Sequence, residues 1–116
     1  MEECIFCAIA SGSQKADIVH SDEGCVAFRD IHPKAPVHIL IVPKQHIASV
    51  ADTSDANTEL LGHLVRRAAD IAAQQGIAQS GYKLVFNVGR GGGQVIDHVH
   101  LHILGGWNNG DAMLAV

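Results

Sequence analysis

Residues 98–104 read His98-Val99-His100-Leu101-His102-Ile103-Leu104, so histidine alternates with apolar residues along this stretch. Successive side chains of a β-strand point to opposite faces. The alternation therefore predicts a strand from Val95 to Leu104, with the three histidines on one face and the apolar side chains in the core. Three imidazoles along about 14 Å of strand would bring together a nucleophile, proton carriers and metal ligands near neutral pH. A chance polar stripe on an exposed strand is the alternative, and the regular alternation and the β-branched spacers oppose it.

The rest of the chain predicts an α+β fold, in which a mostly antiparallel sheet carries one long helix on a face and a short N-terminal helix. We expect strands at residues 18–20, 25–28, 37–42, 83–88 and 95–104, and helices at residues 5–10 and 55–75. Thr53 or Ser54 can cap the long helix, and Gly76 suits the left-handed residue after its end. No repeat or long linker divides the sequence, so residues 1–116 are expected to form one domain.

The composition argues against several classes of protein. The chain has 116 residues, of which 47% are hydrophobic, as a folded globular domain requires. Lys and Arg number 8 against 12 Asp and Glu, a formal net charge of -4, which speaks against binding to a nucleic-acid polymer. The N-terminus is acidic where a secretory signal is basic, and the longest apolar run, residues 39–42, is too short to span a bilayer. We therefore expect a cytoplasmic protein with no membrane partner.

Histidine and cysteine are the residue types that suggest chemistry. The 8 histidines equal the whole Lys and Arg count. The three cysteines, Cys4, Cys7 and Cys25, favour reduced thiols or a metal site over a disulfide framework, since their number is odd. Cys4 and Cys7 have the spacing that lets two thiolates reach one ion, although two small cysteines packed as hydrophobic residues would give the same pattern. An enzyme and a small metal-binding domain both remain open.

The glycine-rich segment Gly89-Arg90-Gly91-Gly92-Gly93 stands directly before the histidine stretch. It leads into a strand and lacks the spacing of a nucleotide-binding P-loop. Its backbone N–H groups can still form a nest for one phosphate. A flexible hairpin loop is the alternative interpretation of the segment alone, and phosphate binding is favoured once the neighbouring histidines are considered.

The His-x-His-x-His pattern resembles the signature of the histidine triad family. The similarity covers nearly the whole chain, through residues 4–6, 28–31, 36–43 and 104–106. The sequence is similar in particular to the Hint branch, the purine nucleoside phosphoramidate hydrolases, and its ending from Gly105 and its last four residues, 113–116, agree with that branch. The resemblance implies a homodimer with a shared sheet, and hydrolysis of a bond between a purine nucleotide phosphate and an amine.

The resemblance also implies roles for individual histidines. His100 matches the nucleophile that attacks phosphorus and forms a nucleotidyl-imidazole, with its other nitrogen held as N–H by a backbone carbonyl of the same strand. His102 matches the histidine that hydrogen-bonds the phosphate. His98 is the first member of the triad, and His38 matches a fourth active-site histidine; a buried core histidine is the alternative for His38.

Further residues match the family's nucleotide-binding positions. Asp30 matches the carboxylate that binds the ribose hydroxyls, although a turn aspartate would look the same locally. Asn87 matches an asparagine on the leaving-group side, and the segment Gly93, Gln94 and Val95 is expected to bind phosphate, through the backbone N–H groups of Gly93 and Val95. The base is expected to lie against Ile5, Phe6, Ile9, Phe28 and Ile31.

Three departures from the family pattern affect the same site. Val95 replaces a serine, so one hydroxyl hydrogen bond is missing, and we expect a lower rate rather than another reaction. Asp97 replaces an aromatic residue at the rim. Gln14 and Lys15 replace Ile-Pro, which predicts a base pocket that is more open on its far side.

Zinc is the one cofactor that the resemblance implies. Some bacterial members bind it through the equivalents of Cys4, Cys7, His46 and His98, a set that suits a closed structural site with no position for a reacting water. Catalysis is therefore expected to need no cofactor. His20, His32 and His63 match no catalytic position, and His63 is expected to be solvated or at a dimer face. Two alternatives stay open: a dinucleoside polyphosphate hydrolase of the same family, and a zinc-stabilised nucleotide-binding interaction module with weak catalysis.

Overall fold

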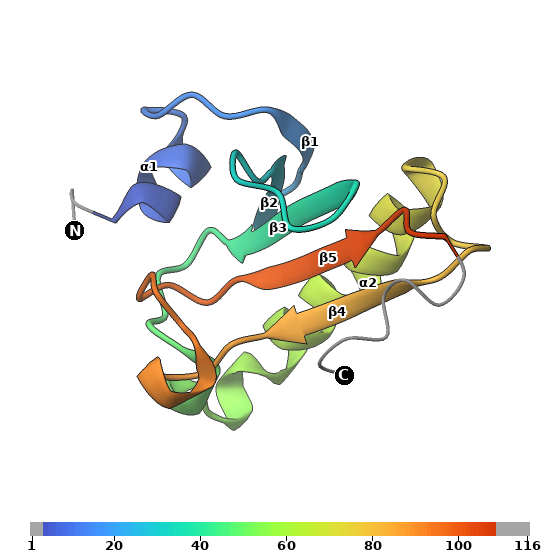
Figure 1. The fold of residues 1–116 in the computed structure, drawn as a ribbon. Coiled ribbons are helices and arrows are strands. Elements are labelled where there is room, and N and C mark those ends of the chain that lie inside the picture. Colours follow the sequence, from blue (N-terminus) through green and yellow to red (C-terminus); the bar gives the residue numbers. More distant parts are fainter. Residues whose placement is uncertain (1–3, 109–116) are drawn as a thin grey trace.

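A five-stranded antiparallel sheet forms the centre of the protein, and helices lie on both of its faces (Figure 1). The computed structural model describes residues 4–108. The strands are β1 (Ile18–Ser21), β2 (Cys25–Arg29), β3 (Val37–Pro43), β4 (Tyr82–Phe86) and β5 (Leu101–Gly105), in the spatial order β1-β2-β3-β5-β4. The predicted α+β fold is confirmed. The last four residues, 113–116, which support the resemblance to the Hint branch, lie outside the described part of the chain.

Two helices flank the sheet. The short α1 (Ile5–Ser11) packs on β2 and β3, and the long α2 (Thr58–Gln74) packs on β3 and β5. Ser54 rather than Thr53 provides the cap, because its hydroxyl accepts from Ala56 N–H at the start of the turn Asp55–Asn57 that leads into α2. Gly76 has φ 77°, as expected for the left-handed residue after the helix. No helix among residues 4–108 has both the length and the apolarity that crossing a bilayer requires.

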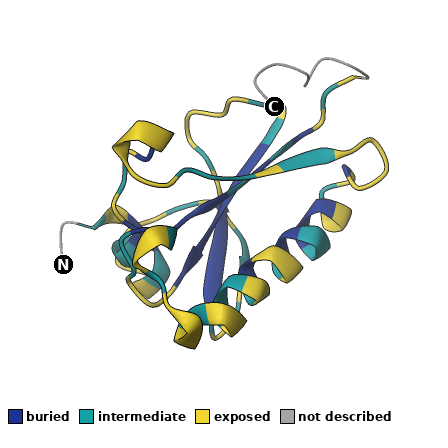
Figure 2. Cartoon of the chain, turned by 90° about the horizontal axis from the view of Figure 1, so that it is seen from below, coloured by how far each residue is buried: buried dark blue, intermediate teal, exposed yellow. Residues whose placement is uncertain are grey.

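The two faces of the sheet carry separate apolar clusters. Ile39 and Ile41 of β3 point toward α2, whereas Leu40 and Val42 point toward α1. All four are at most 5% exposed, so β3 is covered on both sides, as its unbroken apolar sequence requires (Figure 2). Phe6 and Ile9 of α1 complete the second cluster. Residues of neighbouring strands that pair with Leu40 therefore also point to the α1 face. This is the face that holds the histidines.

The predicted strand from Val95 to Leu104 is wrong in its first half, because β5 begins only at Leu101. Before that point the chain does not pair with the neighbouring strand. The backbone N–H of Val99 donates to Ile47 O at 2.7 Å, and the side-chain ring of His98 donates to Pro43 O at 2.8 Å. The alternation of faces nevertheless continues through both halves. Val99, Leu101 and Ile103 belong to the cluster under α2, whereas His100 and His102 face the other way.

Candidate active site

A pocket of about 530 Å³ opens on the α1 face of the sheet. Its lining brings together most of the residues expected to act on a nucleotide: Phe6, Asp30, His38, Asn87, Gly93, Val95, His100 and His102. The histidines come from two neighbouring strands, because Leu40 of β3 pairs with His102 of β5 and both side chains point to this face. His38 and His102, 64 positions apart along the chain, are thus placed side by side by strand register.

His100 is fixed in one tautomer. Its Nδ1 lies 2.7 Å from the carbonyl oxygen of His98, and because a carbonyl only accepts, Nδ1 carries the proton. Nε2 is then left with a lone pair. The side chain is buried against Phe6, whose ring centroid is 5.0 Å away, and the residue is 8% exposed. The ring therefore offers a nucleophilic nitrogen held in one orientation.

His38 and His102 form a chain of hydrogen bonds with a defined direction. Lys34 N–H donates to His38 Nδ1 at 3.0 Å, so the proton of His38 is on Nε2. That nitrogen lies 3.0 Å from His102 Nδ1, which must accept, and His102 keeps its proton on Nε2. Burial lowers the pKa of His38 below its usual value, and burial together with His100 and His38 lowers the pKa of His102 to about 4. Both rings are neutral near pH 7, and His102 has an N–H group to donate.

Asp30 joins this pocket to a second, apolar one. Its Oδ1 accepts from His32 N–H at 2.8 Å, as a turn aspartate would, while its Oδ2 lies 3.5 Å from His38 Nε2. The second pocket, of about 270 Å³, is lined by all the residues expected to contact a base, together with the two polar residues that depart from the family pattern: Ile5, Phe6, Ile9, Phe28, Ile31, Gln14 and Lys15. Ile31 is 83% exposed and so lies at the rim.

The glycine-rich loop is braced by hydrogen bonds within itself and to the neighbouring chain. Gly93 N–H donates to Arg90 O at 3.0 Å in the turn Arg90–Gly92, so it is already used by the loop. Gln94 is 3% exposed and its side chain does not line the pocket, because it binds Ala48 O and Gly89 N–H. Among residues 4–108, the Val95 N–H donates to no protein acceptor.

Two features of the rim were not foreseen from the sequence. Asp97 pairs with Arg90 at 2.9 Å across the glycine-rich loop. Lys34 lines the histidine pocket, and its backbone fixes the tautomer of His38. A lysine directly after the His32-Pro33 turn was the only signal available, and such a turn lysine is ordinarily solvent-exposed.

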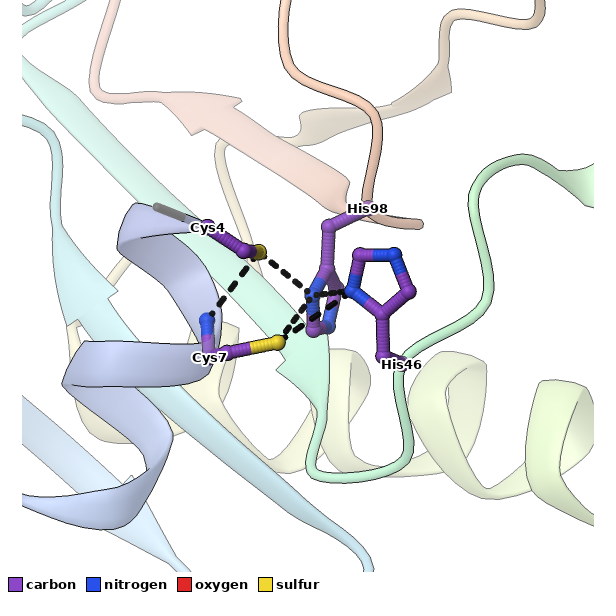
Figure 3. Close-up of side chains that lie close together, drawn as sticks. All are labelled: Cys4, Cys7, His46 and His98. Carbon is purple, nitrogen blue, oxygen red and sulfur yellow. Dashed lines mark hydrogen bonds between the residues drawn. The ribbon is translucent and has the colours of Figure 1, made fainter. Parts of the chain in front are cut away.

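Four potential metal ligands meet at the start of α1 (Figure 3). His98 Nδ1 lies 3.3 Å from the Sγ of Cys4 and 3.5 Å from the Sγ of Cys7. His46 Nδ1 lies 3.2 Å from the Sγ of Cys7 and 3.1 Å from His98 Nδ1. In tetrahedral zinc coordination a sulfur and a nitrogen lie about 3.5 Å apart and two nitrogens about 3.3 Å apart. The observed spacings fit such an ion closely.

The protonation of these ligands also suits a metal. His98 Nε2 donates to Pro43 O at 2.8 Å, so Nδ1 presents its lone pair to the two sulfurs. Burial raises the pKa of Cys7 to about 11, and the hydrogen bond and charge of Cys4 add to this. A divalent cation would offset that cost and hold both thiolates. The Cys2His2 set can therefore hold zinc with all four positions filled by protein.

Comparison with known proteins agrees with this fold and site. Residues 3–113 match the family model described as "Scavenger mRNA decapping enzyme C-term binding", a domain of the histidine triad type. The chain belongs to the histidine triad family. Among its relatives is the purine nucleoside phosphoramidase of Escherichia coli, 48% identical over 105 residues, which are 90% of this chain and 88% of that protein.

Solved structures of the family superpose over most of the chain. A HIT family hydrolase from Legionella pneumophila is 49% identical with a TM-score of 0.89, and covers 91% of this chain and 95% of its own. A Zn-bound histidine triad protein from Mycobacterium smegmatis is 30% identical with a TM-score of 0.79, over 96% of this chain and 79% of its own.

Proposed function

We propose that the protein is a nucleotide hydrolase that cleaves the P–N bond of purine nucleoside phosphoramidates through His100. The observation that carries the proposal is the hydrogen bond of His100 Nδ1 to His98 O, which leaves Nε2 as a nucleophile in a pocket shared with Asp30 and His102. The name of the Escherichia coli relative supports this substrate class, and the Legionella relative is also a hydrolase.

The reaction would proceed in two steps. His100 Nε2 forms a bond to phosphorus while the P–N bond breaks and the nitrogen takes a proton from solvent to leave as the amine, giving a nucleotidyl-histidine. Water then attacks phosphorus, loses a proton to solvent, and releases the nucleotide and His100. The Nε2–H of His102 and the Val95 N–H would donate to the phosphoryl oxygens, where negative charge increases in the transition state. No metal takes part in either step.

The two joined pockets would bind the rest of the substrate. Asp30 lies between them, where its carboxylate can accept from the two ribose hydroxyls. The purine would occupy the apolar pocket between Phe6, Phe28 and Ile31. Asn87 lines the same pocket, where its amide donates to Gly92 O at 2.8 Å, and we propose that it faces the amine as it leaves.

Turnover of adenosine 5′-phosphoramidate by the wild type and by His100→Asn tests the mechanism. We expect the variant to lose at least about 10³-fold in kcat, because it lacks the nucleophile. His32→Asn is the matched control, since this exposed histidine lines the same pocket without a hydrogen bond from its ring. Because a histidine–phosphorus bond is labile in acid and stable in alkali, a denaturing quench at alkaline pH should trap a nucleotidyl-protein in the wild type only. Equal rates for the wild type and His100→Asn would refute the proposal.

A substrate panel separates the closest alternatives. The wild type should hydrolyse nucleotide amidates faster than dinucleoside polyphosphates and sugar nucleotides. A preference for dinucleoside polyphosphates would assign the protein to that branch of the family. Purine nucleotide binding without turnover would instead favour an interaction module.

We also propose that Cys4, Cys7, His46 and His98 hold a structural zinc ion, and that the whole chain is one domain that forms a homodimer in the cytoplasm. The ligand spacings and the zinc-bound Mycobacterium smegmatis relative support the zinc site. Zinc measured in protein purified without added metal should approach one equivalent or more, and less than about one-tenth would contradict the site.

A further inference from the structure

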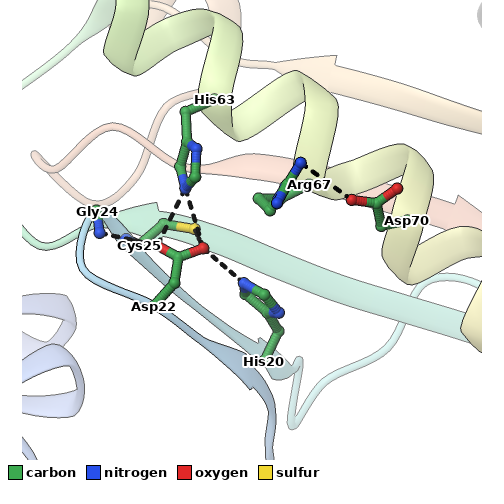
Figure 4. Close-up of polar contacts among 7 residues, drawn as sticks. All are labelled: His20, Asp22, Gly24, Cys25, His63, Arg67 and Asp70. Carbon is green, nitrogen blue, oxygen red and sulfur yellow. Dashed lines mark hydrogen bonds and ion pairs between the residues drawn. The ribbon is translucent and has the colours of Figure 1, made fainter.

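A second group of metal-ligating side chains lies between the β1–β2 turn and α2 (Figure 4). We define the turn cluster as His20 on β1, Asp22 in the turn, Cys25 at the start of β2 and His63 on α2. It lies on the face of the sheet that α2 covers, whereas the histidine pocket is on the α1 face. We expected His63 to be solvated or at a dimer face; its ring instead lies against Asp22.

The donor atoms of the turn cluster converge on one carboxylate. His20 Nε2 is 2.6 Å from Asp22 Oδ2, and His63 Nε2 is 3.0 Å from each oxygen of Asp22. Cys25 Sγ is 3.6 Å from Oδ2. The ligand atoms of His20, Asp22 and Cys25 all lie within 4.8 Å of one another. His63 Nε2, from the opposite layer of the fold, is in contact with Asp22 but is not part of that set of three, so its ring would move toward an ion held by the other three ligands.

We propose that the turn cluster is a second metal site, which binds a zinc-class divalent ion through His20, Asp22, Cys25 and His63 and joins the β1–β2 hairpin to α2. Imidazole, carboxylate and thiolate together are ligands of zinc and its neighbours among the transition metals, whereas Ca²⁺ and Mg²⁺ prefer oxygen alone. The site shares no residue with the first group of potential metal ligands, Cys4, Cys7, His46 and His98, which we call the Cys4–Cys7 cluster. It is also independent of the proposed hydrolase activity.

The central ligand is already oriented by the backbone. Asp22 Oδ1 accepts from Gly24 N–H at 2.8 Å and from Cys25 N–H at 3.0 Å, so the turn holds the carboxylate in place. A carboxylate that two backbone N–H groups hold in one orientation needs no rearrangement of the turn to bind a cation.

Gly24 makes room for the fourth ligand. A Cβ at this position would lie 3.3 Å from Cδ2 and 3.5 Å from Nε2 of His63. The absence of a side chain therefore lets the ring of His63 reach Asp22. Half-buried side chains leave a path for the ion, because His20, Asp22 and His63 are 24%, 25% and 34% exposed. An open surface pocket with Glu23 and Glu59 in its lining adjoins the site, and both carboxylates attract cations.

Metal binding would exchange protons and hydrogen bonds in a balanced way. The ion would replace the Nε2–H···O bonds that His20 and His63 make to Asp22, and each neutral imidazole would transfer its proton from Nε2 to Nδ1 through solvent, which frees the Nε2 lone pair for the ion. Coordination by the Cys25 sulfur would release its thiol proton to solvent, as it does for other thiolate ligands. Arg67 is already paired with Asp70 at 3.2 Å.

Zinc titration of the full chain in a Cys4→Ser/Cys7→Ser background tests the site, because this background removes the other cluster. After chelation and dialysis against Zn²⁺ alone, we expect one equivalent of bound zinc and a zinc-dependent rise in Tm. Adding His20→Ala or His63→Ala should weaken binding at least about tenfold, and both together should abolish the equivalent. His32→Ala is the matched control and should bind as the background does. Asp22 is left intact because its loss would disrupt the turn itself.

Co²⁺ in the same background reports on the sulfur ligand. A thiolate-to-cobalt charge-transfer band should appear, and Cys25→Ser should remove it; without such a band, Cys25 is not a ligand and the four-residue site is refuted. If the double cysteine variant fails to fold, the comparison moves to the wild type, where two equivalents are expected against one in His20→Ala/His63→Ala. Equal zinc content in those two proteins would show that the turn cluster is only a hydrogen-bond network.

Discussion

At the scale of single residues, the pocket places each imidazole proton by means of a backbone group. His98 O fixes the proton of His100, and Lys34 N–H fixes that of His38, which in turn fixes His102. One lone pair, on His100 directly before β5, and one N–H group, on His102 of β5, thereby face the pocket. The same rings with exchanged protons would offer neither group in the place that the proposed reaction needs, so that reaction depends on these backbone hydrogen bonds.

Substitution of Val95 by serine should increase the rate. Val95 is 81% exposed at the pocket rim, so the change leaves the fold intact, and a hydroxyl there would add one donor to the transition state. We expect kcat for adenosine 5′-phosphoramidate to rise about tenfold or more in Val95→Ser. Val95→Ala removes the same bulk without adding a donor and should stay within about twofold of the wild type. Equal rates for the two variants would contradict the role of a hydroxyl at this position.

Burial of neutral histidines predicts loss of stability in mild acid. The pKa of His102 is lowered from 6.5 to about 4, so between these pH values the unfolded chain binds more protons than the folded chain. The free energy of unfolding should therefore fall as the pH falls through this window, by about 3 kcal/mol at most from His102. Urea denaturation from pH 7 to pH 4 measures the slope. His102→Gln should reduce it, and an unchanged slope would contradict the assigned cause.

At the scale of elements, much of the fold could be predicted because local patterns determine it. The hairpin around Asp22 and the long helix ending before Gly76 lie where turn chemistry and apolar spacing indicate. The last strand was predicted too long, since the partners that take over its hydrogen bonds, Ile47 and Pro43, are set by tertiary contact. The role of Gln94 was missed for the same reason: its acceptor Ala48 is 46 residues away.

The attachment of α1 to the sheet should depend on zinc. A helix of 7 residues is too short to be stable alone, and the Cys4–Cys7 cluster ties its first turn to His98 beside β5. Cys4→Ser/Cys7→Ser should remove one zinc equivalent and lower Tm by roughly 8 °C, as expected for a loss of about 2 kcal/mol. Because Phe6 of α1 lines both pockets, KM should rise, while kcat well below the transition should stay within about threefold.

Zinc content and activity, measured on the same variant, show whether this prediction fails. If Cys4→Ser/Cys7→Ser keeps the wild-type zinc content, the ligands are misassigned. If it keeps its fold but loses kcat as severely as His100→Asn, the metal takes part in the chemistry and is not purely structural.

At the scale of the whole molecule, charge is organised locally rather than globally. The formal net charge is -4, yet the proposed substrate is an anion. The histidine pocket offsets this through neutral N–H donors and through Lys34, which lines it. Such short-range donors act in a partly desolvated site, where hydrogen bonds to charge are strong and the distant acidic residues are screened. The net negative charge is therefore expected to slow the approach of an anionic substrate more than it weakens binding inside the pocket.

The sheet has two outer strands, β1 and β4, and we take β4 as the candidate edge for the proposed dimer. An edge strand offers unpaired backbone groups to a second copy. Leu84 on β4 is 37% exposed, and Val88 just beyond it is 38% exposed, so apolar side chains accompany this edge. Light scattering should give a dimer mass for the wild type, and Leu84→Asp should weaken association at least about 100-fold, since the interface would bury two such carboxylates. Ile18→Asp places the same charge on β1, at a residue 44% exposed, and should remain dimeric. A monomeric wild type, or dissociation by both variants alike, would exclude a dimer built on β4.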